Sequence, residues 1–179
     1  YGRRGTPTSA AFEEAVADIY AADGAVAVSS GLAAIACALQ AIVKSGDHIL
    51  VADTVYRPTR NYCDGYLAAM GVTTTYYNPR LGAEIAALIT DQTKAVFVES
   101  PGSLTFEIMD IPAIAAAVHE KDIPVIMDNT WASAMFFKTF EKGVDIVVEA
   151  VTKYICGHSD VMMGVMVANE PHLQKVRVM

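Results

Sequence analysis

The chain has 179 residues, 53% of them hydrophobic, and a formal net charge of -7 at pH 7. This composition provides one well-buried core and gives little attraction for nucleic acid or anionic lipid. No apolar run reaches the roughly 20 residues that a membrane-spanning helix needs, and no secretory signal opens the chain. We therefore expect one soluble domain that binds neither nucleic acid nor a membrane.

Helical and strand-like segments alternate along the chain. Ser9 is predicted to cap a helix over residues 10–21, with Glu13 and Glu14 in its first turns, where the helix dipole favours acidic groups. Predicted strands follow at 25–29, 47–52, 72–77, 94–99, 123–128 and 144–148, and predicted helices at 32–44, 59–70, 83–89, 111–120 and 171–177. This alternation favours an α/β fold with a mostly parallel central sheet flanked by helices.

The three cysteines bear on the redox environment of the protein, and the two chain ends bear on whether the chain is part of a longer one. Cys37, Cys63 and Cys156 are widely spaced and form no CxxC pair, which argues against a disulfide framework and against a zinc site. We expect a reducing, cytoplasmic environment. The chain opens at Tyr1 and closes within a predicted helix, so we expect residues 1–179 to be part of a longer polypeptide.

In α/β sheets ligands bind at the carboxyl ends of the strands. Asp128 closes one predicted strand, and Lys153 follows another. An amine that forms a Schiff base and a carboxylate that keeps a pyridine nitrogen protonated are the groups that a pyridoxal-phosphate enzyme needs. Cys156, Gly157 and the run 161–167 are predicted to enclose Lys153, which favours the neutral, nucleophilic amine.

Two further turns are candidate site segments. Ser30, Gly31 and Leu32 lie between a strand and a helix, where helix N-terminal amides can bind a phosphate, although such a turn is more often ordinary turn chemistry. Tyr56 can stack on a cofactor ring or be a boundary aromatic.

Plainer interpretations remain for the charged candidates. Asp128 alone fits a helix cap equally well, and a lysine is most often a solvated surface residue. His158 and Asp160 lie two positions apart on a loop and form no ligand set by themselves. We therefore expect no metal site, and a role in bracing the lysine loop is simpler.

Six motifs in combination resemble the Cys/Met-metabolism family of fold-type I pyridoxal-phosphate enzymes, most closely its bacterial cystathionine beta-lyase branch. The motifs are Tyr1–Thr6, Ser30–Leu32, Thr54–Pro58, Glu99–Ser103, Asp128–Trp131, and Ala150–Tyr154 followed by Gly157–Asp160. The resemblance covers essentially the entire chain. It implies a large cofactor-binding domain over residues 1–179, without the N-terminal arm and the small C-terminal domain of the family.

The resemblance also implies residue roles. Lys153 would hold pyridoxal 5'-phosphate and move the proton from the substrate Cα, Asp128 would pair with the ring nitrogen, and Tyr56 would stack on the ring and assist proton transfer. The phosphate would be bound by Ser30, Gly31, Leu32 and Thr152, and by Tyr1 and Arg3 from the neighbouring subunit. The expected assembly is a homodimer with shared sites, within a dimer of dimers.

Departures from the wider family favour beta-elimination. Ala150 replaces a serine that many members carry three positions before the lysine, Pro58 replaces the cysteine of methionine gamma-lyases, and Trp131 replaces Phe or Tyr. The implied reaction converts L-cystathionine to homocysteine, pyruvate and ammonia. A cysteine or cysteine-conjugate beta-lyase would share these residues. An α/β protein that binds a phosphate-bearing ligand without turnover is the alternative from a different class.

Overall fold

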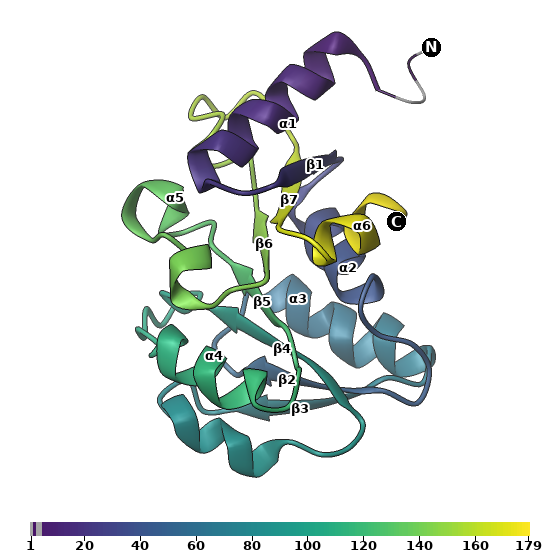
Figure 1. The fold of residues 1–179 in the computed structure, drawn as a ribbon, viewed down its shortest axis with the longest axis vertical. Helices are drawn as coiled ribbons and strands as arrows, with labels where there is room; N and C mark the ends of the chain where they lie inside the picture. Colours follow the sequence, from purple (N-terminus) through teal and green to yellow (C-terminus); the bar gives the residue numbers. More distant parts are fainter. Residues whose placement is uncertain (1, 3–4) are drawn as a thin grey trace.

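The computed structural model describes residue 2 and residues 5–179, which fold around one seven-stranded sheet with the order β1-β7-β6-β5-β4-β2-β3 (Figure 1). The strands are β1 (Gly24–Val28), β2 (His48–Ala52), β3 (Thr73–Tyr77), β4 (Thr93–Glu99), β5 (Val125–Asp128), β6 (Ile146–Glu149) and β7 (Gly164–Ala168). Among these strands β7 alone runs against its neighbours, pairing antiparallel with β1 and β6. The predicted mostly parallel α/β sheet is confirmed.

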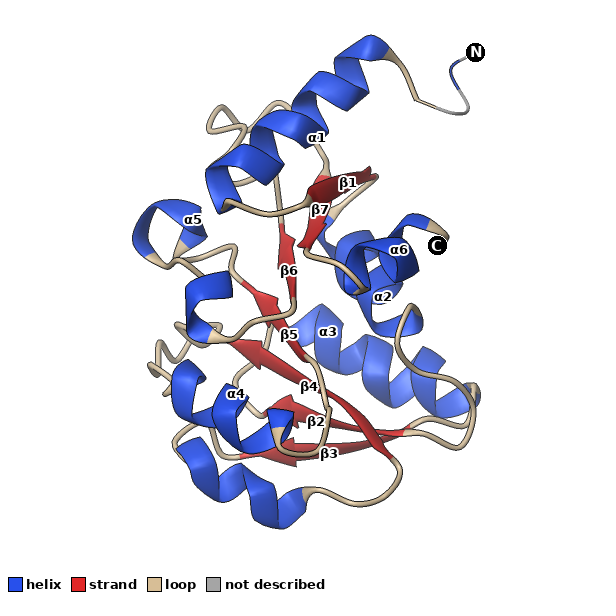
Figure 2. Cartoon of the chain, viewed as in Figure 1, coloured by secondary structure: helices blue, strands red, loops and turns tan. Residues whose placement is uncertain are grey.

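Helices cover both faces of the sheet. They are α1 (Pro7–Tyr20), α2 (Gly31–Gln40), α3 (Arg57–Tyr62), α4 (Ile111–His119), α5 (Ser133–Phe136) and α6 (His172–Arg177), with a π-helical turn at Cys63–Leu67 and 3-10 turns at Gly82–Leu88 and Phe140–Lys142. Figure 2 shows α2 and α3 on one side of the sheet and α4 and α5 on the other. Because both faces are covered, β2, β5, β6 and β7 are buried along their whole length. Within the described part of the chain, no helix is long and apolar enough to cross a membrane.

The start of the first helix differs from the prediction. Thr6, not Ser9, is the N-cap, and its hydroxyl accepts from the Ser9 amide while the Ser9 hydroxyl accepts from the Thr6 amide. This capping box starts the helix three residues early, so Glu13 and Glu14 lie beyond its first turn. The Glu13 carboxylate instead accepts the Ala27 amide of β1 at 2.8 Å.

Other boundaries shift where the helical pattern continues past the true helix end. The predicted helix 32–44 ends at Gln40, and the predicted helix 59–70 is α3 followed by the π-helical turn. The predicted helix 83–89 is a 3-10 helix. The Val/Met-rich run 161–167 contributes the antiparallel strand β7.

The parallel strands bring their last residues to one edge of the sheet. Glu99 at the end of β4 is in register with Asp128 at the end of β5, and Asp128 is in register with Val148 of β6. The antiparallel β7 begins at the same edge, where Gly164 pairs with Val28 of β1. Residues far apart in the sequence therefore meet at this carboxyl edge.

Candidate active site

A cavity of about 700 Å³ opens at the carboxyl edge of the sheet. Seven of the nine predicted site residues line it: Ser30, Gly31, Leu32, Tyr56, Asp128, Thr152 and Lys153. The remaining two, Tyr1 and Arg3, lie outside the described residues, so their contribution to a neighbouring subunit stays a prediction.

The N-terminus of α2 faces the cavity. Ser30 caps the helix by accepting the Ala33 amide at 3.1 Å, and the first intrahelical bond runs from the Ala34 amide to the Ser30 carbonyl. The amides of Gly31 and Leu32 precede that bond, so they are oriented like helix N-terminal amides that bind anions.

Gly31 is required by packing as well as by ligand access. A Cβ at this position would lie 2.7 Å from the Cβ of Ala150 and 3.2 Å from its Cα. The start of α2 thus rests directly on the chain that leaves β6.

Thr152 reaches the cavity, but its hydroxyl is already engaged. Its Oγ1 donates to the Met163 carbonyl at 3.2 Å and accepts the Met163 amide at 3.1 Å. These bonds tie the segment after β6 to the segment before β7. A hydroxyl donor for a phosphate is available from Thr152 only if the bond to Met163 is exchanged.

Lys153 lies in the turn after β6 and its side chain is exposed, which corrects the prediction that neighbouring residues enclose it. Its backbone is fixed, because its amide donates to the Ala150 carbonyl at 2.9 Å and its carbonyl accepts the Gly157 amide at 2.8 Å. The amine therefore stands at the open side of the cavity.

Cys156 holds the loop that follows Lys153. It does so through His158 and Asp160, the two residues that were expected to brace this loop. His158 Nδ1 lies 2.7 Å from the Cys156 carbonyl, and the Cys156 thiol donates to Asp160 at 3.1 Å. Among the described residues no cluster of three or more His, Cys, Asp or Glu side chains could hold a metal ion.

Asp128 and Glu99 form a pair of buried carboxyl groups at the inner wall of the cavity. Asp128 Oδ1 accepts the Thr130 amide at 3.0 Å, and Glu99 Oε2 accepts the Tyr56 amide at 2.7 Å. Burial raises the pKa of Asp128, and burial together with the neighbouring Asp128 raises the pKa of Glu99 to about 8. A cationic group placed beside Asp128 would restore its ionised form.

Tyr56 stands at the N-terminus of α3, where the residue is 47% exposed and borders the cavity. The loop that carries Tyr56 packs against, and is hydrogen-bonded to, the segment after β4. The Ser103 amide donates to the Thr54 carbonyl at 2.8 Å, and a Cβ on Gly102 would lie 2.8 Å from the Thr54 Cβ. Glu99 adds the bond to the Tyr56 amide, so Tyr56 is positioned through its backbone.

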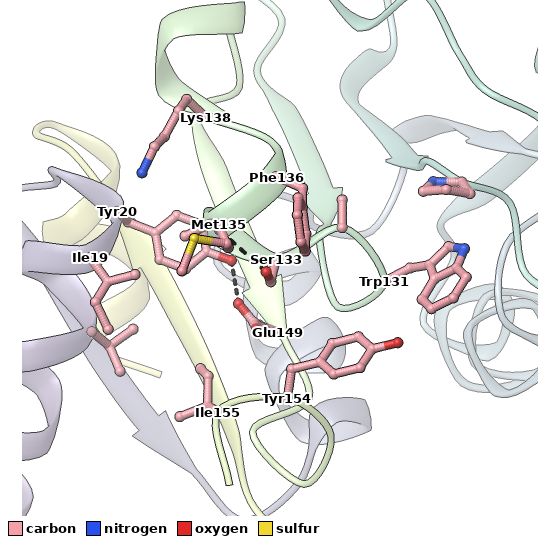
Figure 3. A pocket seen from close by; sticks show the side chains of 14 residues that line it. Ile19, Tyr20, Trp131, Ser133, Met135, Phe136, Lys138, Glu149, Tyr154 and Ile155 are labelled. Carbon is pink, nitrogen blue, oxygen red and sulfur yellow. Dashed lines mark hydrogen bonds between the residues drawn. The ribbon is translucent and has the colours of Figure 1, made fainter. Parts of the chain in front are cut away.

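A second cavity, of about 720 Å³, lies beside the first and is bordered by α1 and α5. Figure 3 shows the Tyr20 hydroxyl pointing at the Glu149 carboxylate, to which it donates a hydrogen bond. The Asn129 amide donates to the Tyr20 oxygen at 3.2 Å. Burial raises the pKa of Glu149 to about 7. Sequence reasoning assigned no role to Glu99 or Glu149, although each ends a buried apolar strand as Asp128 does.

An aromatic wall separates the two cavities. Trp131 and Tyr154 line both of them and stack with ring centroids 6.1 Å apart, and Phe106 approaches Trp131 at 6.0 Å. All three residues are more than 45% exposed, which leaves apolar surface open on this side of the sheet.

The cavity matches the four parts of pyridoxal 5'-phosphate. The amine of Lys153 suits the aldehyde, the carboxyl of Asp128 suits the pyridine nitrogen, and the exposed ring of Tyr56 suits the ring face. The amides of Gly31 and Leu32 suit the phosphate. The donor set and the space therefore fit this cofactor.

Comparison with known proteins agrees with this chemistry. The family described as Cys/Met metabolism PLP-dependent enzyme matches residues 1–179. Cystathionine beta-lyase MetC of Escherichia coli is 41% identical over 179 residues, which are 99% of this chain and 45% of that protein. A Rhizobium johnstonii protein named provisionally as a cystathionine beta-lyase is 46% identical, with the same coverage of 99% and 45%.

A solved structure supports the same relationship. The crystal structure of MetB from Corynebacterium glutamicum superposes with a TM-score of 0.96 at 35% identity, covering 100% of this chain and 47% of that one. The chain thus spans about half the length of these relatives. It belongs to the Cys/Met metabolism family of PLP-dependent enzymes.

Proposed function

We propose that the protein is a PLP-dependent carbon–sulfur lyase that cleaves L-cystathionine by beta-elimination into homocysteine, pyruvate and ammonia. The observation that carries the proposal is the convergence of Lys153, Asp128 and the N-terminus of α2 on one cavity in a chain of this family. When bound, the cofactor supplies an electron sink for negative charge at the substrate Cα.

Cofactor binding and proton transfer would be carried out by several residues of the chain. Lys153, on the open side, would carry the cofactor and then act as the base that takes the Cα proton. Asp128, buried on the inner wall, would keep the ring nitrogen protonated. Tyr56 would cover one ring face and, near the substrate amine, assist proton transfer. The amides of Gly31 and Leu32 would hold the phosphate, with Ser30 ordering that turn.

The choice of beta-elimination rests on the relatives. The Escherichia coli and Salmonella typhimurium proteins, 41% and 42% identical to this chain, are named cystathionine beta-lyases. A Dictyostelium discoideum relative at 36% is named a cystathionine gamma-lyase. A Wolbachia pipientis relative at 38% is named an L-alanine/L-glutamate racemase, an activity that also begins with loss of the Cα proton.

The exposed apolar side chains support an assembly larger than these residues alone. Leu104, Phe106, Met135, Phe136 and Met162 are each at least 60% exposed and gather around the two cavities. Apolar patches of this kind mark contact surfaces. We propose a homodimer in which Tyr1 and Arg3 complete the neighbouring cofactor site, a dimer of such dimers, and a cytoplasmic location.

Turnover by the full-length protein tests the proposal. L-Cystathionine should yield pyruvate and homocysteine, whereas gamma-elimination would yield 2-oxobutyrate and cysteine, and a racemase would yield the D-amino acid without a keto acid. L-Cysteine and a cysteine conjugate, assayed in parallel, separate a broad beta-lyase from a cystathionine-specific one. A protein that binds the cofactor but releases no product from any of these substrates would contradict enzymatic function.

The same assay needs a residue-level control. Lys153→Ala should abolish turnover, because no other group at this position can hold the cofactor and move the proton. Lys121→Ala removes an exposed lysine that does not line the cavity, and should leave turnover unchanged.

A further inference from the structure

Glu99 is a buried acidic residue for which the proposed roles leave no task. It ends β4, is 8% exposed, lines the cavity, and stands in register with Asp128 on the neighbouring strand. Paired residues on adjacent strands project to the same face of a sheet, so both carboxyl groups face the site. Burying a second carboxyl group beside Asp128 costs free energy, which calls for a compensating role.

The hydrogen bond of Glu99 identifies that role. Its Oε2 accepts the amide of Tyr56 at 2.7 Å, and Tyr56 is the residue from which α3 starts. Tyr56 is about half exposed, and the side-chain bond recorded for it within the described part of the chain uses its backbone amide and not its hydroxyl. The orientation of the ring therefore depends on the backbone, whose amide Glu99 holds.

The other backbone bonds around Tyr56 hold its neighbours, including the Val55 amide, which donates to the Ala52 carbonyl at 3.2 Å, but not the Tyr56 amide itself. The clasp between Ser103 and Thr54 fixes the loop two residues before Tyr56, and the helical bonds of α3 begin where Thr59 and Arg60 donate to the Tyr56 carbonyl. Glu99 is the group that joins the Tyr56 amide itself to the rigid sheet.

We propose that Glu99 is a positioning residue that fixes the Tyr56 backbone and so holds its ring over the cofactor. This inference rests on the proposed cofactor role of Tyr56. It requires a hydrogen-bond acceptor that reaches the Tyr56 amide and does not require the negative charge of the carboxylate.

Two substitutions separate reach from the ability to ionise. Glu99→Gln keeps the length and an acceptor oxygen but removes the ionisable group. Glu99→Asp keeps an ionisable carboxyl group but is one methylene shorter, which takes the oxygen out of hydrogen-bond range of the amide. In the full-length protein, Glu99→Asp should weaken cofactor binding about fivefold to tenfold, the scale of a lost aromatic stack, while Glu99→Gln stays within about twofold.

The same variants should be measured in a Tyr56→Ala background. If Glu99 acts through the Tyr56 ring, Glu99→Asp should cause less than about a twofold further change there, because the ring that it orients is gone. The readouts are the cofactor dissociation constant and the visible circular dichroism of bound cofactor. Asp110→Ala is the matched control, since it removes a carboxylate bond to a helix-start amide, that of Ala113, away from the cavity.

The outcomes decide between the two proposals. A wild-type protein that binds no cofactor would refute the proposed function itself. If the cofactor binds, three results would overturn the role of Glu99 alone: a larger loss for Glu99→Gln than for Glu99→Asp, equal losses with and without the Tyr56 ring, or no loss in either variant. Unfolding of both variants would make Glu99 a structural residue and would overturn it equally.

Discussion

The two faces of the carboxyl edge place buried carboxyl groups in contrasting surroundings. On the face of the first cavity, Glu99 accepts the Tyr56 amide and Asp128 accepts the Thr130 amide. On the face of the second, Glu149 accepts a side-chain hydroxyl from Tyr20, which is itself bonded to Asn129. Both sets of carboxyl groups border a cavity, but the one that receives a buried tyrosine hydroxyl fits a structural role, whereas those that share a cavity with Lys153 and the start of α2 are available to a ligand.

The largest expected difference between the two faces is in turnover. Asp128→Asn should bind cofactor but lose about 100-fold or more in kcat, because the amide cannot stabilise a protonated ring nitrogen. Glu149→Gln should keep kcat within about threefold, since the amide oxygen can still accept from Tyr20. The measurement is steady-state turnover of the full-length protein at saturating substrate. Equal losses in the two variants would remove the distinction between the faces.

A steric change at the start of α2 tests how tightly this helix packs beside the first cavity. Gly31→Ala places a Cβ 2.7 Å from the Ala150 Cβ, and overpacking of this kind costs about 1–3 kcal/mol in the free energy of unfolding. Cofactor affinity should fall as well, because the phosphate-facing amides shift. Adding Ala150→Gly should recover part of both losses. Unchanged stability and affinity in Gly31→Ala would refute the packing argument.

On the second face, Tyr20→Phe tests whether the hydrogen bond to Glu149 is structural. Removing the hydroxyl leaves Glu149 buried without its side-chain donor, which should lower the free energy of unfolding by about 1–3 kcal/mol. Cofactor affinity should stay within about twofold. Chemical denaturation and cofactor titration on the same preparation separate these effects, and a selective loss of cofactor affinity would assign Tyr20 to the functional face.

A further expected effect is a pH dependence of stability shared by both faces. The pKa values of Glu99 and Glu149 rise from 4.5 to about 8 and about 7, so between pH 4.5 and these values the folded state binds more protons than the unfolded state. This contribution to stability is complete below pH 4.5 and is lost as the pH rises through 7 and 8. The melting temperature of the cofactor-free protein should therefore fall between pH 6 and pH 8.5.

Glu99→Gln and Glu149→Gln provide the control for that slope. Each removes one titrating group and should flatten the decline in melting temperature relative to wild type. A wild-type protein whose stability rises over this range, or variants with an unchanged slope, would show that these carboxyl groups are ionised in the folded state.

Strand ends were the most predictable part of the molecule. The apolar runs before Asp128 and Lys153 are buried strands, and the parallel arrangement brought their ends to one cavity, as the alternation of elements predicted. The same signal pointed to Glu99 and Glu149. It does not assign them a role, because the face that a strand-end side chain occupies depends on register with neighbouring strands.

Contacts within loops and helix caps could not be predicted from the apolar pattern. The exposure of Lys153 follows from how the loop 153–160 folds back on Cys156, and the bonds of Thr152 follow from the unforeseen approach of Met163. The helix start moved from Ser9 to Thr6 because the reciprocal capping box outweighed a single capping hydroxyl.

Direct identification of the cofactor-bearing residue tests the central claim. The full-length protein, loaded with pyridoxal 5'-phosphate and reduced with borohydride, should carry the cofactor irreversibly on one lysine. Peptide mass spectrometry should locate it on Lys153, and Lys153→Ala should show no labelled peptide. Labelling at a different lysine, or undiminished labelling of Lys153→Ala, would contradict the assignment of this cavity as the cofactor site.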